Sequence, residues 1–105
     1  MATKTITVHS SSCNPSGTQG QRNVDSIHFI QADANAPTTV TITAAPGSTV
    51  DPSTLFGNTS CKVDANASGS NVYAIQATAD LGNYSVDTPS GVRATLNAGT
   101  ISVNG

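Results

Sequence analysis

The sequence contains no glutamate and no tryptophan, and only four of its 105 residues are lysine or arginine. Proteins that bind nucleic acid neutralise phosphates with many basic side chains, so this composition argues against a nucleic-acid partner. The same scarcity excludes a polybasic membrane anchor. No apolar run approaches the roughly 18 residues of a membrane-spanning helix. We therefore expect neither nucleic-acid binding nor insertion into a membrane.

Good helix formers are scarce as well. Leucine and lysine are rare beside threonine and serine, and no run of ten residues has the apolar spacing of a helix. Threonine instead alternates with valine and isoleucine in several segments, which is typical of half-buried strands. A chain of this length forms one domain, here residues 1–105. The sequence predicts a single all-β domain.

The alternation places seven or eight short strands along the chain, joined by turns rich in glycine and proline. This spacing is typical of an antiparallel Greek-key β-sandwich. In the strand at 72–79, the alternation fits two registers: Tyr73 and Ile75 face either the core or the solvent. The predicted strands are 3–9, 24–31, 39–44, 60–65, 72–79, 83–87, 92–96 and 100–103.

Two segments between these strands have distinct patterns. Residues 10–22 lack apolar periodicity and predict a long loop. Leu55 and Phe56 are apolar within a region punctuated by proline and glycine. We expect them to fold back onto the core through one helical turn after Asp51.

The two cysteines, Cys13 and Cys61, are an even count in a polar chain. A bridge between them would close a loop of about fifty residues and stabilise the fold by about 4 kcal/mol. Two buried free thiols are the alternative. The predicted disulfide favours a periplasmic or secreted protein whose signal segment has been removed, with the cytoplasm as the alternative.

Two segments resemble the cupredoxin family. Residues 23–42 resemble its Asp-x-Val-x-Phe strand, Asn/Asp turn and Pro-His-x-Val strand. Residues 81–103 resemble its ending, in which Gly-x-Tyr precedes the copper loop and Gly-Thr-Ile-x-Val follows it. Together they cover somewhat under half the chain. The resemblance implies a cupredoxin-like sandwich, with an immunoglobulin-like sandwich as the alternative. The residues that match in the second segment are Gly82, Tyr84, Gly99, Thr100, Ile101 and Val103.

The copper ligands of that family are missing. The resemblance places the first histidine at Thr38, the cysteine at Asp87 and the second histidine at Ser90, and no methionine follows. A type 1 site holds copper with two imidazoles and a thiolate, which these side chains cannot replace. The resemblance therefore implies the scaffold without type 1 copper, and we expect no cofactor.

His9 and His28 are the only imidazoles, and with Cys13 and Cys61 they are the only candidates for a metal site of nitrogen and sulfur ligands. Their spacing matches no zinc motif, and both histidines fall on outward-facing positions of strands. We expect solvated surface histidines. The triplet Asp-Ala-Asn occurs twice, at 33–35 and 64–66, and has the alternating oxygens of a calcium loop, but both copies stand where turns are expected.

Catalytic patterns are absent from the sequence. There is no Gly-x-Ser-x-Gly and no pair of glutamates for glycoside hydrolysis. We predict a non-enzymatic binding or structural module whose surface meets another protein, a polymer or copies of itself. The alternative is a metal-binding protein that uses His9, His28 and loop oxygens. A small carbohydrate-binding domain is third, because Tyr73 and Tyr84 are expected to pack in the core rather than stack on sugars.

Overall fold

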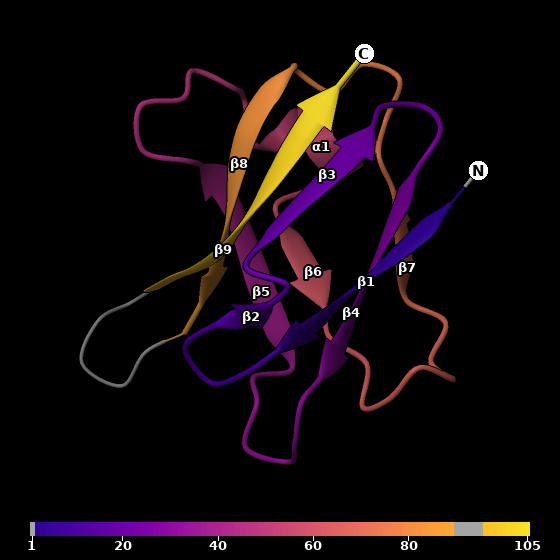
Figure 1. The fold of residues 1–105 in the computed structure, drawn as a ribbon, viewed down its shortest axis with the longest axis vertical. Coiled ribbons are helices and arrows are strands. Elements are labelled where there is room, and N and C mark those ends of the chain that lie inside the picture. The colour runs from indigo at the N-terminus through magenta and orange to yellow at the C-terminus, as the bar shows by residue number, and fades with distance from the viewer. Residues whose placement is uncertain (1, 90–95) are drawn as a thin grey trace.

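The computed structural model describes residues 2–89 and 96–105, which form strands and one short helix in two packed sheets (Figure 1). The prediction of an all-β fold is confirmed. The elements of the described residues are β1 (Thr3–Val8), β2 (Cys13–Asn14), β3 (Gly17–Gln21), β4 (Ser26–Gln31), β5 (Thr39–Ala44), α1 (Ser53–Phe56), β6 (Ser60–Lys62), β7 (Val72–Ala74), β8 (Gly82–Thr88) and β9 (Leu96–Asn104).

One sheet has four strands in the order β2-β1-β4-β7, and the other has five in the order β3-β9-β8-β5-β6. Both sheets are mixed rather than purely antiparallel, because β1 pairs with β4 and β3 pairs with β9 in parallel. Between β1 and β4 the chain crosses to the other sheet through β2 and β3, so β4 can run in the same direction as β1. The prediction of an entirely antiparallel sandwich was wrong for these two pairs.

The core lies between the two sheets. Alternate residues of β1 and β4 contribute one side of it, including Ile6 and Phe29, and β5, β8 and β9 contribute the other, including Ile42 and Ile101. Ile75 is buried and Val72 is exposed, so the first of the two registers considered for the strand near Tyr73 is the one observed.

The short helix α1 closes one end of this core. Leu55 and Phe56 are buried, and the Asp51 carboxylate accepts hydrogen bonds from the backbone N–H of Ser53 at 3.0 Å and from its hydroxyl at 2.8 Å. The chain leaves the helix at Gly57, whose φ of 89° favours glycine. The predicted helical turn that carries apolar residues onto the core is confirmed.

The predicted long loop at 10–22 was wrong, because it contains β2 and β3. Only Thr18 and Gly20 of β3 point inward, and neither is apolar enough to reveal a strand. A Cβ on Gly20 would lie 2.4 Å from Ile75 Cδ1, so a larger residue would have to displace that side chain. The predicted strand at 92–96 lies outside the described residues except for Leu96, where β9 begins.

Candidate functional site

An open groove of about 280 Å³ lies between β1 of one sheet and β3 of the other. Its walls are polar and supply an ammonium group, a carboxylate and several carboxamides, but no aromatic ring. The residues that line it are Lys4, Gln19, Gly20, Gln21, Asp25, Asn104 and Gly105.

Two side chains at this groove hold the backbone of β3. Lys4 Nζ donates a hydrogen bond to the carbonyl of Gln19 at 2.6 Å, and it lies 3.9 Å from Asp25 Oδ2. The same Asp25 oxygen accepts the backbone N–H of Gln21 at 2.8 Å. The groove therefore has balanced charge, and both ends of the ion pair are already anchored to β3.

The outer edge of β1 has unpaired backbone groups beside this groove. Ser26 N–H donates to the carbonyl of Ala2 at 2.8 Å, and Ala32 N–H donates to that of Val8 at 2.9 Å. Because bonding in a parallel pair alternates along the strand, the even-numbered residues of β1 bond to β4 and the odd-numbered ones point away. The two-residue strand β2 covers only Thr7 and Val8 of β1.

The backbone N–H and C=O groups of Thr3 and Thr5 thus have no partner among the described residues, and both residues are exposed. We call these groups, together with the groove beside them, the open edge. Figure 1 shows β1 beginning at the N-terminal end of the chain, at the margin of the molecule. An unpaired edge beside a groove is a surface to which a further strand can be added.

The opposite side of the molecule, formed by β6, β7 and residues 63–71 between them, is called here the closed edge. Lys62 N–H donates to the hydroxyl of Tyr73 at 2.7 Å, which links β6 of one sheet to β7 of the other. Ser60 N–H donates to Asn58 Oδ1 at 3.1 Å, and Val72 N–H donates to the carbonyl of Ser70 at 2.9 Å. Each of these N–H groups is occupied within the chain.

His28 lies beneath the connection at the closed edge. Its side chain is on the outer face of β4 but is only 6% exposed, and Nε2 lies 2.7 Å from Asp64 Oδ2. Asp64 also accepts the side-chain N–H of Asn71 at 2.6 Å and its backbone N–H at 2.9 Å. The bond from the Asn71 side chain, that from His28 and that from the Asn71 backbone together lower the pKa of Asp64. The expectation that His28 is solvated was wrong, because the chain after β6 folds over it.

The metal-site candidates do not converge. His9 is exposed just after β1, whereas His28 is buried against Asp64. Within residues 2–89 and 96–105, no group of three or more histidine, cysteine or acidic side chains could hold a metal ion. The Asp64 oxygens that a calcium loop would need already accept hydrogen bonds from Asn71 and His28.

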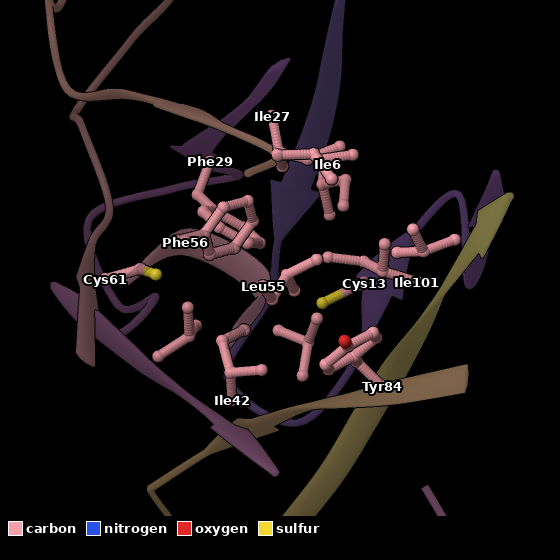
Figure 2. Close-up of a cluster of buried hydrophobic side chains, with 14 of the residues drawn as sticks. Ile6, Cys13, Ile27, Phe29, Ile42, Leu55, Phe56, Cys61, Tyr84 and Ile101 are labelled. Carbon is pink, nitrogen blue, oxygen red and sulfur yellow. The ribbon is translucent and has the colours of Figure 1, made fainter. Parts of the chain in front are cut away.

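The predicted disulfide is not formed, because Cys13 and Cys61 are separate free thiols. Cys13 belongs to β2 at one border of the four-stranded sheet, and Cys61 belongs to β6 at the far border of the other. Figure 2 shows them on different sides of the core with Leu55 between them. Burial raises the pKa of Cys13 to about 11 and that of Cys61 to about 12, so neither is a reactive thiolate near pH 7.

The positions at which the cupredoxin family has copper ligands are placed as follows. Thr38 is exposed just before β5. Asp87 is buried in β8, where Oδ2 accepts the hydroxyl of Thr43 at 2.8 Å and Oδ1 accepts that of Ser85 at 2.5 Å. Ser90 lies outside the described residues. Asp87 is therefore held by hydroxyl groups on the outer face of the five-stranded sheet.

The open edge could not have been located from the sequence. The alternation of residues 3–9 predicts the strand, but the parallel pairing with β4 decides which of its backbone groups remain free. The one available signal was Lys4, a charged residue at an inward-facing position of an otherwise apolar and hydroxylated strand. Inward-pointing charges are typical of the borders of sheets.

Comparison with known proteins found no match to this chain. No protein-family profile matches it, and neither curated proteins nor solved structures gave a significant match. In the described part of the chain, no helix has the length and hydropathy needed to cross a membrane.

Proposed function

We propose that this protein is a non-enzymatic binding module that holds an extended polypeptide at the open edge. The observation that carries this proposal is the pair of exposed residues, Thr3 and Thr5, whose backbone groups have no partner within residues 2–89 and 96–105 and lie beside a polar groove. An added strand would form main-chain hydrogen bonds with both residues, and the groove would receive side chains from alternate positions.

The chemistry of the other polar groups favours binding over catalysis. The buried imidazole of His28 is bonded to Asp64, and both thiols are protonated near pH 7. The metal-binding alternative finds no support in the described residues, because His28 is not free to bind an ion. A saccharide ligand is less well supported than a peptide, because the groove lacks an aromatic platform.

A cupredoxin-like Greek-key scaffold without type 1 copper remains part of this proposal. Its basis is the resemblance of residues 23–42 and 81–103, in which Thr38, Asp87 and Ser90 stand where the family has copper ligands. Export from the cell also remains a proposal, but the disulfide that favoured it is not formed.

The proposal is tested by titrating the isotopically labelled protein with a capped peptide of seven residues that alternates threonine with valine and one lysine. We expect amide shift changes at Thr3 and Thr5 that saturate at millimolar peptide, since short strands bind weakly. Amides of Lys62 and Val72 at the closed edge are internal controls and should not shift. The same peptide N-methylated on alternate residues should not bind. Shifts confined to any other surface would refute the proposal.

A further inference from the structure

We infer that the polypeptide held at the open edge carries a glutamine whose side chain enters the groove between β1 and β3. This inference rests on the proposed function and adds the chemistry of the partner. In an added strand, the residue opposite Lys4 faces the same side of the sheet as Lys4 does. Its side chain therefore enters the groove that Lys4, Gln19 and Asp25 help to line.

The free stretch of β1 is short, so few residues of the partner are paired. The strand β2 already pairs with Thr7 and Val8. The backbone groups of Thr3 and Thr5 have no partner among the described residues, and Lys4 stands between them. An added strand therefore pairs through three residues, two of them on the outer face and one on the inner face. The inner residue is the one that meets the groove, so it determines the specificity.

The groove offers both a cationic donor and an anionic acceptor. Lys4 Nζ donates to the carbonyl of Gln19 at 2.6 Å, whereas Asp25 Oδ2 lies at 3.9 Å, beyond hydrogen-bond distance. An ammonium group has three N–H donors, so two of them have no acceptor in the described part of the chain. Asp25 Oδ2 accepts the backbone N–H of Gln21, whereas Oδ1 accepts no hydrogen bond from residues 2–89 or 96–105. A ligand can therefore both donate and accept here.

A side chain that donates and accepts without a net charge satisfies both groups. A carboxylate would bond to Lys4 but stand against the like charge of Asp25, and an ammonium group would do the reverse. An apolar side chain would remove water from both charges and replace none of the hydrogen bonds. A carboxamide accepts from Lys4 with its oxygen and donates to Asp25 with its nitrogen.

The length of the side chain follows from Lys4. Its four-carbon stem reaches from β1 to the carbonyl of Gln19 in β3. A residue beside it in an added strand starts from the same sheet, so it needs a side chain of similar length. Glutamine meets this requirement, and asparagine is shorter by one methylene. Threonine on either side of the glutamine suits the exposed Thr3 and Thr5, because threonine pairs across strands are favourable.

Four capped peptides test this inference in the wild-type protein. They share the sequence Ser-Ser-Thr-X-Thr-Ser-Ser, in which X is glutamine, glutamate, lysine or methionine, all unbranched and of similar length. Amide shifts of Thr3 and Thr5 report binding, and those of Lys62 and Val72 at the closed edge are controls. We expect the glutamine peptide to bind about fivefold more tightly than each of the others, which is the effect of about one hydrogen bond.

Two charge variants test whether the pair of Lys4 and Asp25 sets this preference. Lys4→Met leaves Asp25 without its cation, so the lysine peptide should become the tightest ligand. Asp25→Asn keeps an oxygen that accepts the N–H of Gln21 but removes the negative charge, so the glutamate peptide should become the tightest. Thermal unfolding checks that both variants are folded, and each of them tests the inference without the other.

The inference is overturned if the four peptides bind the wild type equally or not at all, if a peptide other than that with glutamine binds most tightly, or if the variants leave the order unchanged. The proposed function still stands in these cases when the peptide that alternates threonine with valine shifts Thr3 and Thr5. If no peptide shifts these two amides, both proposals fail.

Discussion

The two sides at which the sheets meet are built in different ways. At the closed edge a tyrosine hydroxyl bonds across from β7 to β6, and the connection between them binds a buried histidine through Asp64. At the open edge Lys4 reaches from β1 to the carbonyl of Gln19 in β3 and to Asp25, and Thr3 and Thr5 are exposed. Side-chain bonds therefore connect the sheets on both sides, and the open edge differs by the backbone groups of Thr3 and Thr5, which have no partner among the described residues.

Removal of Tyr73 should have the largest effect on stability. Its ring lies 5.6 Å from that of Phe56 and 6.5 Å from that of Phe29, and its hydroxyl accepts the N–H of Lys62. Tyr73→Ala should lower the free energy of unfolding by about 3 kcal/mol, measured by urea titration.

The matched variant Tyr73→Phe separates the ring from the hydroxyl. It keeps the aromatic contacts with Phe56 and leaves the N–H of Lys62 without its acceptor, so we expect a loss of about 1 kcal/mol. A loss as large as that of Tyr73→Ala would mean that the hydroxyl, and not the ring, accounts for the stability of this edge. If neither variant is less stable than the wild type, Tyr73 does not stabilise the closed edge and the distinction between the two edges fails.

Two glycines provide the second comparison. A Cβ on Gly69, at the closed edge, would lie 2.2 Å from Cγ of Asp64, whereas a Cβ on Gly17, in β3, would meet nothing within 4 Å. Gly69→Ala should therefore displace the carboxylate from His28 and destabilise the protein by about 2 kcal/mol. Gly17→Ala should change stability by less than about 0.5 kcal/mol in the same urea titration. The comparison fails if both substitutions are equally tolerated.

The pH dependence of stability tests the network at Asp64. Hydrogen bonds from Asn71 and His28 hold the pKa of Asp64 below its usual range, so the ionised form is favoured in the folded state. Its contribution is then present above the unfolded pKa of about 3.9 and is lost as the pH falls toward the lower folded value. The stability difference between the wild type and Asp64→Asn should shrink as the pH falls below about 4. A difference that grows in acid would contradict this assignment.

The sequence predicted the strands whose apolar residues alternate, such as those that bury Ile6, Ile42 and Val86, and also the helical turn that buries Leu55. Local pattern decides these elements because each buries its own apolar face. It missed β3, whose inward side chains are a threonine and a glycine, because Ile75 from a distant segment fills the space above Gly20. At β3 the apolar contact with the core comes from Ile75, which lies far away in the sequence.

The candidate site depended on pairing that sequence patterns do not encode. An outward position in β4 predicted a solvated His28, yet residues 63–71 cover it and supply Asp64. An even cysteine count predicted a bridge between Cys13 and Cys61, yet the two belong to opposite borders of the sandwich. Both errors have one origin, because distances between distant segments follow from strand order and not from composition.

The smallest effect on stability is expected from Lys4 at the open edge. Its side chain is 39% exposed, and its nitrogen lies 3.9 Å from Asp25 and 2.6 Å from the exposed carbonyl of Gln19. Water can replace both partners, so exposed charge interactions of this kind contribute between about 0 and 1 kcal/mol. Lys4→Met keeps an unbranched apolar stem of similar length and should change the free energy of unfolding by less than about 0.5 kcal/mol, well below the loss from Tyr73→Phe. If Lys4→Met instead destabilises the fold by more than Tyr73→Phe, the ion pair is a structural clamp, and the side we describe as open is closed by electrostatic means.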